Sequence, residues 1–302
     1  MIKKYSGVVV PMVTPFTEKE EIDGAAVKRI CENFVNNGVS PLLLGTTGES
    51  TSVSPENSQA LVKAAVKAIN KKVIVYAGLS GNCVKQNIES AQAYIDLGVD
   101  VIVSILPNYY PLTPQQMYDY YIKIADAVSC PVMIYNIPAT TNMSIPLDIV
   151  VKLSEHPNIC GFKDSERDEQ RIEKCLSMFS DREDFSYFVG VAKYSAIALR
   201  KGADGIIPST ANFTPVMFRQ LYEFSLAGKW DEAERIQNET NEIAKIYQEG
   251  RTLGQSLPAM KTMMSVLGIC SPYSVLPLTT PSLDEQNEII AATKEIMKKY
   301  SI

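Results

Sequence analysis

Residues 97–106 read LGVDVIVSIL, in which a glycine turn leads directly into an apolar, β-branched run. Gly98 follows an amphipathic segment, and glycine accepts the left-handed conformation that ends many helices. The same punctuation occurs at 37–40 (NGVS) and 201–204 (KGAD). The run itself lacks polar alternation, which is typical of a parallel strand buried on both faces. The repeated order of helix, glycine and strand predicts an α/β fold with a parallel sheet.

Eight such apolar runs occur before residue 210, each followed by a longer amphipathic segment. They span 7–13, 41–45, 73–77, 101–106, 132–135, 159–163, 185–189 and 205–207. Eight strand and helix units in this length favour a closed (β/α)8 TIM barrel. An open, doubly wound parallel sheet remains the alternative.

Helix starts also repeat. Ser54-Pro55, Thr113-Pro114 and Thr214-Pro215 each place a hydroxyl at the N-cap and a proline at the first helical position. After the last of them the pattern becomes wholly helical, over 216–227, 230–248, 257–267 and 284–299. We therefore expect a barrel over 1–225 and a C-terminal helical extension over 226–302.

Composition excludes several functional classes. The 302 residues carry 29 Lys and Arg against 34 Asp and Glu, a net charge of −5, which repels a phosphate backbone and disfavours nucleic acid. Six cysteines stand apart without a CxxC pair, and no apolar run approaches the roughly 18 residues of a membrane helix. We expect a cytoplasmic protein that binds no membrane.

The single histidine, His156, precedes a proline in a polar turn and is expected at the surface near a helix end. Zinc sites with two histidines and Ser-His-Asp triads are thereby nearly excluded. The sequence also has no metal-ligand cluster and no GxGxxG after a strand. We expect chemistry done by side chains, without a metal or cofactor.

In a barrel the reactive groups lie at the C-terminal ends of the strands. This rule selects GTTGES at 45–50, PNYY at 107–110, YNIP at 135–138 and Lys163 with Asp164. Lys163 ends an apolar run, where burial would lower its pKa and make the amine a nucleophile. The alternative is a lysine that reaches from the strand end into solvent.

The turn at 45–48 has glycine at both ends and two threonine hydroxyls between them. Its successive N–H groups suit an anion, and because no Lys-Ser/Thr follows, a carboxylate is favoured over a nucleotide phosphate. An ordinary glycine turn is the alternative. Tyr109 and Tyr135 could relay protons with Thr46, or could simply be core rings. An amine, a carboxylate-binding turn and phenols together indicate reversible carbon–carbon bond formation at a 2-oxo acid.

At these residues the sequence resembles the dihydrodipicolinate synthase and N-acetylneuraminate lyase family of Schiff-base class I aldolases. The likeness runs from GVVVPMVTP at 7–15 to the C-terminal helices, and GTTGES, YNIP and GFKD (161–164) occur in the family's order and spacing. The resemblance implies that Lys163 forms an imine with pyruvate, that Tyr135 is the acid–base phenol, and that Thr46 and Thr47 bind the carboxylate and orient the phenol.

The resemblance also implies that Tyr109 enters a neighbouring subunit's site, which makes a homotetramer, a dimer of dimers, part of the mechanism. No cofactor is implied. The catalytic candidates are thus Lys163, Tyr135, Thr46 and Tyr109. The substrate-binding candidates are Thr47, Gly45, Gly48, Thr140, Gly190, Lys193 and Ile207.

Two departures from the family pattern bear on the aldehyde partner. Dihydrodipicolinate synthases carry an arginine two residues after YNxP, where this chain has Thr140, which points toward the sugar-acid aldolases and lyases. Neuraminate lyases have an acidic pair after the glycine that ends strand 7, where this chain has Ala192 and Lys193. Lys193 could hold an anionic group of the aldehyde, or it could face solvent.

Three hypotheses follow. The first is a pyruvate-dependent aldolase or lyase acting on a 2-oxo-3-deoxy sugar acid or a related acid. The second is a dihydrodipicolinate synthase that condenses pyruvate with aspartate semialdehyde and replaces the missing arginine with another cation such as Lys193. The third is a catalytically silent sensor that binds an acidic metabolite at the barrel mouth.

Overall fold

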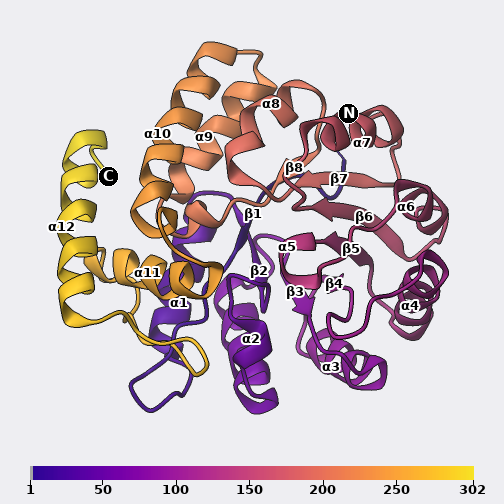
Figure 1. Cartoon of the computed structure of the whole chain (residues 1–302), viewed down its shortest axis with the longest axis horizontal. Coiled ribbons are helices and arrows are strands. Elements are labelled where there is room, and N and C mark those ends of the chain that lie inside the picture. Colours follow the sequence, from indigo (N-terminus) through magenta and orange to yellow (C-terminus); the bar gives the residue numbers. More distant parts are fainter. Residues whose placement is uncertain (1–2) are drawn as a thin grey trace.

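The computed structural model describes residues 3–302 and contains eight parallel strands that close into a barrel in chain order (Figure 1). The strands are β1 (Gly7–Pro11), β2 (Ser40–Leu43), β3 (Tyr76–Leu79), β4 (Val101–Ile105), β5 (Val132–Asn136), β6 (Ile159–Asp164), β7 (Ser186–Val189) and β8 (Gly205–Ile206). Because β8 pairs with β1, the sheet has no edge. The predicted (β/α)8 barrel is confirmed, and the open sheet is wrong.

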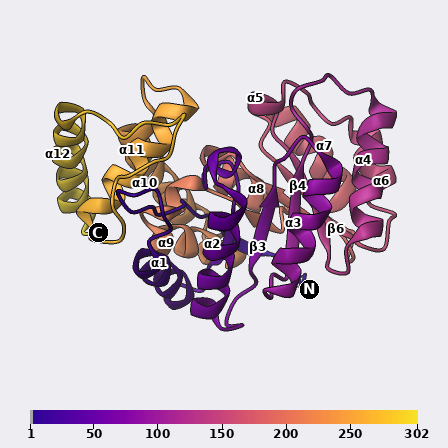
Figure 2. The same cartoon turned by 90° about the horizontal axis from the view of Figure 1, so that it is seen from below.

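Helices connect successive strands on the outside of the barrel (Figure 2). Those of the barrel are α1 (Gly24–Asn36), α2 (Pro55–Ile69), α3 (Val84–Asp96), α4 (Pro114–Ala127), α5 (Pro138–Thr141), α6 (Leu147–Leu153), α7 (Glu169–Phe179), α8 (Ser195–Arg200) and α9 (Pro215–Leu226). Short 3₁₀ turns lie at η1 (Ser50–Ser52), η2 (Ala192–Tyr194) and η3 (Ser209–Asn212).

Three further helices follow, α10 (Trp230–Gln248), α11 (Leu253–Val266) and α12 (Leu283–Tyr300), and they gather at one side of the barrel (Figure 1). No helix within residues 3–302 is both long and apolar enough to cross a membrane.

Local signals placed most boundaries correctly. Gly38, Gly98 and Gly202 have positive φ angles of 62°, 102° and 100° at the ends of their helices. Ser54 accepts a hydrogen bond from the Asn57 N–H, and Thr113 forms a capping box with Gln116. Those helix ends behave as predicted.

Several boundaries differ from the prediction by a few residues, among them the start of α11, which is Leu253 and not residue 257. Two differences have a clear physical cause. The third strand is Tyr76–Leu79 rather than 73–77, because its pairing with β4 begins at Tyr76 opposite Val101 and continues through Gly78 to Leu79. Thr214 precedes α9 as expected, but its side chain makes no capping bond and its hydroxyl is buried without a partner among residues 3–302. Backbone pairing and the local chain path therefore override the sequence signal at these two places.

The apolar core has two layers, as a filled barrel requires. One layer lies between the strands and the surrounding helices. The other fills the lumen and comprises Val9, Leu42, Tyr76, Val101, Val103, Ile105, Met133, Tyr135, Ile137, Cys160, Phe188 and Ile207. The lumen is therefore closed by side chains below its C-terminal mouth, which leaves the strand ends as the place for a site.

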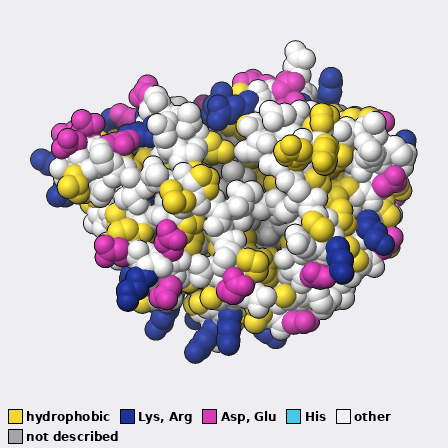
Figure 3. Space-filling model, turned by 60° about the horizontal axis from the view of Figure 1, so that its bottom comes forward, with side chains coloured by type: hydrophobic (Ala, Val, Ile, Leu, Met, Phe, Trp, Pro, Cys, Tyr) yellow, Lys and Arg dark blue, Asp and Glu magenta, His cyan; other side chains and the backbone are white. Residues whose placement is uncertain are grey.

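All six cysteines are free thiols, and only Cys83 is exposed. His156 lies in the turn that follows α6, where its Nε2 is 3.0 Å from Oδ1 of Asp126 and its Nδ1 accepts the N–H of Asn158. Charged side chains of both signs are interspersed over the face in Figure 3. That face offers no continuous basic band of the kind that binds nucleic acid.

Candidate active site

Lys163 and Tyr135 are paired residues on the neighbouring strands β6 and β5, at the C-terminal end of the barrel. Because paired residues of parallel strands point the same way, both side chains enter the mouth of the barrel. The Nζ of Lys163 lies 3.7 Å from the centroid of the Tyr135 ring. The structure thus brings together two of the predicted catalytic residues.

Lys163 does not reach into solvent, since only 3% of its surface is exposed. Burial lowers the pKa of Lys163 below its ordinary value, and the Tyr135 phenol opposes this effect. No carboxylate within residues 3–302 forms an ion pair with Lys163. An unpaired, buried amine is populated in its neutral, nucleophilic form far more than a surface lysine is.

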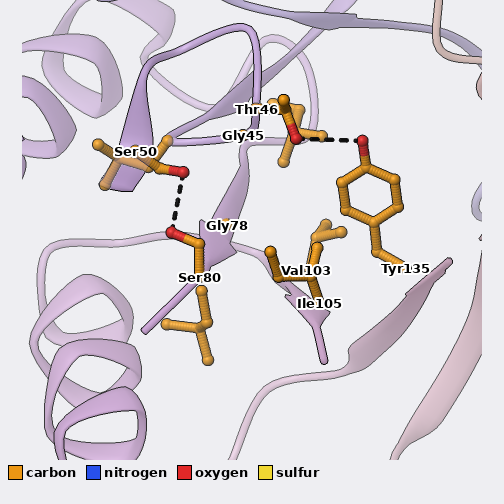
Figure 4. Close-up of a pocket in the computed structure, with 11 residues that line it drawn as sticks. Gly45, Thr46, Ser50, Gly78, Ser80, Val103, Ile105 and Tyr135 are labelled. Carbon is orange, nitrogen blue, oxygen red and sulfur yellow. Dashed lines mark hydrogen bonds between the residues drawn. The ribbon is translucent and has the colours of Figure 1, made fainter. Parts of the chain in front are cut away.

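The Tyr135 hydroxyl shares a hydrogen bond of 3.4 Å with Oγ1 of Thr46 (Figure 4). Thr46 lies in the segment 45–49, here called the threonine turn, which follows β2. A phenol held by a threonine hydroxyl beside a buried amine can exchange protons with a group bound at that amine.

Hydrogen bonds inside the threonine turn fix its shape. The N–H of Gly48 donates to Gly45 O at 3.0 Å, and that of Glu49 donates to Thr46 O at 3.1 Å. The N–H groups of Thr46 and Thr47, by contrast, have no acceptor anywhere in residues 3–302. Two free N–H groups and two hydroxyls suit a carboxylate.

Glycine is needed in this region for close approach. A Cβ at Gly48 would lie 2.9 Å from Met12 O, and one at Gly78 of β3 would lie 2.2 Å from Leu44 O. Gly78 was not singled out from the sequence. The signal that could have found it is a glycine inside a strand, which marks close backbone approach.

A small pocket extends from Tyr135 and Thr46 across Gly45 to the pair Ser50 and Ser80, whose hydroxyls are hydrogen bonded at 2.8 Å (Figure 4). Val103 and Ile105 form its apolar side. The pocket therefore has a polar rim and an apolar wall beside the buried phenol.

The remaining predicted residues surround the mouth at different depths. Ile207 is buried in the lumen, and Gly190 packs directly on the lysine, since an added Cβ would lie 3.2 Å from Lys163 Cε. Thr140 is half-buried in α5 and donates its hydroxyl to Ile137 O at 3.3 Å. Lys193 is exposed, with Nζ 4.5 Å from the Tyr194 ring centroid.

Tyr109 stands apart from the other catalytic candidates. Its side chain is 76% exposed and packs edge-on against Tyr110, with ring centroids 4.9 Å apart. Within residues 3–302 it makes no hydrogen bond to Thr46 or Tyr135. A single chain therefore does not contain the proton relay of two tyrosines and Thr46 that the sequence suggested.

Sequence reasoning missed a buried polar network directly behind Lys163. Asp164 accepts hydrogen bonds from Asn136 Nδ2 at 2.8 Å and from Arg171 Nε at 2.7 Å, and Arg171 also donates to Ile145 O at 2.8 Å. Asn136 accepts the Ile145 N–H at 3.1 Å. The network joins β5, β6, α7 and the loop that follows α5, and so fixes the strand ends that carry the lysine and the phenol.

A second missed feature is a buried ion pair between Glu49 of the threonine turn and Lys261 of α11. Burial raises the pKa of Glu49, and Lys261 opposes the shift; burial likewise lowers the pKa of Lys261, and Glu49 opposes that shift. Both residues are far apart in the sequence, so no local pattern pairs them.

Comparison with known proteins gives one consistent result. The chain matches the model of the dihydrodipicolinate synthetase family over residues 4–296. It is 31% identical to a 4-hydroxy-tetrahydrodipicolinate synthase of Staphylococcus carnosus, with 99% of this chain and 98% of that protein covered.

Solved structures agree. The dihydrodipicolinate synthase of Bacteroides thetaiotaomicron has a TM-score of 0.92 at 28% identity, covering 98% of this chain and 100% of that one. The Acinetobacter baumannii enzyme, solved in complex with pyruvate, has a TM-score of 0.87 at 26% identity, covering 96% of this chain and 98% of that one.

Proposed function

The chain belongs to the dihydrodipicolinate synthetase family and is an aldolase of the lyase class, and from this premise we propose that it is a pyruvate-dependent Schiff-base enzyme acting on a 2-oxo-3-deoxy sugar acid or a related acid. The single observation that carries the proposal is the buried amine of Lys163, 3.7 Å from the centroid of the Tyr135 ring.

In the proposed reaction the neutral amine of Lys163 attacks C2 of pyruvate, and the hydroxyl of the adduct leaves as water, with one added proton, to give a protonated imine. The burial of Lys163 supports this step because it favours the uncharged amine. Loss of a proton from C3 then gives an enamine, whose C3 attacks the aldehyde carbon. Hydrolysis releases the product and regenerates the lysine, and the reverse sequence cleaves the same bond.

Tyr135 is the proposed acid–base group. Its hydroxyl, hydrogen bonded to Thr46, donates a proton to the departing hydroxyl during imine formation and takes it back in the reverse step. Thr46 orients the phenol. The free N–H groups of Thr46 and Thr47 are proposed to bind the pyruvate carboxylate, with Gly45 and Gly48 shaping the turn.

The proposed aldehyde is a neutral, hydroxylated one. Thr140 offers no cation for a second carboxylate, and its hydroxyl already donates to Ile137 O. Ile207 and Gly190 form the apolar and close-packed parts of the site.

Reductive trapping tests the imine. Incubation with pyruvate and borohydride should add one reduced pyruvyl group to the peptide that contains Lys163, as read by mass spectrometry. Lys193→Ala keeps the label, while Lys163→Ala loses it. An unlabelled Lys163 peptide would end the proposal. Pyruvate release from a panel of 3-deoxy-2-oxo acids then identifies the substrate.

A second candidate is 4-hydroxy-tetrahydrodipicolinate synthase activity, which is favoured by the printed name of the Staphylococcus carnosus relative. The missing arginine would then be replaced by Lys193, which is exposed in η2 after β7. A coupled assay with pyruvate and aspartate semialdehyde decides between the two. Turnover that is robust in the parent and lost in Lys193→Ala favours the synthase.

We also propose that Tyr109 completes the site of a neighbouring copy in a homotetramer. Its 76% exposure in the single chain supports this role, because a free aromatic pair with Tyr110 is available for contact. Light scattering should give the mass of a tetramer. Mixing Tyr109→Phe with Lys163→Ala chains should restore part of the activity if one subunit's tyrosine serves another's lysine.

A further inference from the structure

We infer that Lys261, on α11 of the helical extension, is a positioning residue for the threonine turn, and that it acts by holding the side chain of Glu49. This inference rests on the proposed use of the turn to bind the carboxylate of pyruvate. It assigns the extension a part in substrate binding although neither Glu49 nor Lys261 lines the pocket.

The first observation is burial. The side chains of Lys261 and Glu49 form an ion pair in which both are 0% exposed. Charged groups of this kind are almost never fully buried unless they are paired. Lys261 is the charged partner of the Glu49 carboxylate, and the backbone N–H of Val275 and the hydroxyl of Ser274, which follow α11, also lie against that carboxylate.

The second observation is that Lys261 also contacts the threonine turn indirectly, through Thr14. Lys261 Nζ donates to the backbone oxygen of Thr14 at 3.5 Å and to that of Tyr273, and lies 5.0 Å from the centroid of the Phe16 ring. The Thr14 hydroxyl in turn donates to Gly48 O at 2.6 Å. Lys261 therefore contacts the turn through Glu49 directly and through Thr14 at one remove.

The third observation is backbone strain in and beside the turn. Leu44 and Glu49 have positive φ angles of 52° and 57°, although neither is glycine. Such conformations persist only where the surroundings hold them. The Glu49 N–H donates to Thr46 O, so a shift of Glu49 is passed to the residue that offers its own N–H and hydroxyl to the pocket.

Buried polar side chains of the extension reach two other mouth loops as well. Gln237 of α10 bonds Ala192 O and Ala196 N near η2, and Tyr247 bonds the hydroxyls of Ser209 and Thr210 in η3. Of Gln237, Tyr247 and Lys261, only Lys261 reaches the threonine turn. It is also the only one of the three whose side chain carries a charge.

The test uses pyruvate alone, so the aldehyde need not be known. Enamine formation exchanges the methyl protons of pyruvate for deuterium in D₂O, which proton NMR follows. Lys261→Met alone leaves a buried carboxylate unpaired and destabilises the fold. The informative variant is therefore Glu49→Gln with Lys261→Met, which removes both charges and keeps the side-chain volumes similar.

We expect the double variant to fold, with pyruvate at half-maximal exchange raised about 10-fold and the maximal rate within about threefold of the parent, since a displaced turn weakens carboxylate binding but leaves Lys163 in place. Three results overturn the inference. They are unchanged half-saturation, a lost maximal rate at unchanged half-saturation, and a double variant that is unfolded by circular dichroism.

Arg251→Gln is the matched control. It breaks an ion pair of 3.0 Å with Glu285 inside the extension and touches no mouth loop. It should lower the melting temperature slightly and leave half-saturation unchanged. If the parent itself gives no exchange, the proposed function and this inference both fall; if the parent exchanges and the double variant matches it, only the inference falls.

Discussion

Gly190 lies against Lys163 so closely that an added Cβ would stand 3.2 Å from the lysine Cε. The same Cβ would lie 2.1 Å from Ser165 Oγ and 3.2 Å from Asp164 O. Gly190→Ala should therefore displace the lysine and reduce pyruvate exchange about 10- to 100-fold, because catalysis is sensitive to shifts near 1 Å. Proton NMR measures the loss of pyruvate exchange, and the extent of borohydride labelling of Lys163 measures the loss of imine formation.

Two further variants separate the lysine contact from general strain. Gly24→Ala, at the open start of α1 where a Cβ meets nothing within 4 Å, should leave exchange unchanged. Ser165→Ala added to Gly190→Ala relieves the shortest contact but not the contact with Lys163. Full recovery in that double variant would mean that Gly190 serves Ser165 and not the lysine.

Tyr135→Phe keeps the ring beside the amine and removes the hydroxyl. We expect pyruvate exchange to fall about 10²- to 10⁴-fold, the usual effect of losing a positioned acid–base group. Thr46→Val, which removes the 3.4 Å bond to the phenol, should cost less because the phenol itself remains. If the two variants are equally slow, the hydroxyl of Thr46 has a role beyond orienting Tyr135.

The lowered pKa of Lys163 predicts two pH effects, on exchange and on stability, that have the same direction. Exchange at low pyruvate should rise as pH passes the lysine's pKa in the folded protein and level off below pH 10.5, its ordinary value. Because the unfolded chain binds the extra proton in this window, stability also rises with pH there. At pH values below the pKa of Lys163 in both the folded and the unfolded chain, the full free-energy cost of burying the charged amine lowers the stability.

Lys163→Met tests the stability effect directly. At neutral pH it should stabilise the fold by about 1–2 kcal/mol, since a buried ionisable group is replaced by an apolar one. The gain should shrink as pH rises from the folded pKa of Lys163 toward 10.5, its ordinary value, because the parent amine then loses its proton. Lys28→Met on the exposed face of α1 should show no such trend in melting temperature. A constant gain for Lys163→Met would contradict the pKa shift.

The barrel could be predicted from the sequence because the signals for its strands and helix ends are local. Each strand run and each helix-ending glycine, such as Gly98, is legible within about ten residues. The proximity of Lys163 to Tyr135 also followed, since parallel strand ends converge on one mouth. The first residue of a strand is harder to predict from sequence. The third strand begins at Tyr76, later than predicted, because pairing with Val101 and not its own apolar content sets where it begins.

Long-range polar pairs were beyond sequence reasoning. Glu49 belongs to the GTTGES segment, but no residue near it in the sequence indicates its pairing with Lys261. Likewise, the sequence around Asp164 does not indicate that Arg171 and Asn136 bind its carboxylate. Such pairs depend on how helices pack on the barrel. The exposed Tyr109 is a similar case, because a single sequence cannot place a side chain whose proposed partner is another copy.

Arg171→Met should be strongly destabilising. It leaves the buried Asp164 carboxylate without the guanidinium that lies 2.7 Å away, and loss of one partner of a buried pair costs about 3–5 kcal/mol. The exposed pair of Arg235 and Glu239 on α10 provides the comparison, and Arg235→Met should cost only about 0.3–0.5 kcal/mol. Urea unfolding measures both changes.

The loss in Arg171→Met should also depend on pH. Burial already raises the pKa of Asp164, and Arg171 opposes that effect, so removing Arg171 raises the pKa further. A carboxyl with a raised folded pKa destabilises the protein as pH rises from the unfolded to the folded value. The variant should therefore recover part of its stability relative to the parent as pH falls through the raised folded pKa of Asp164 toward 3.8, its ordinary value. A deficit that does not change with pH would show that the arginine stabilises through its bond to Ile145 O and not through the charge of Asp164.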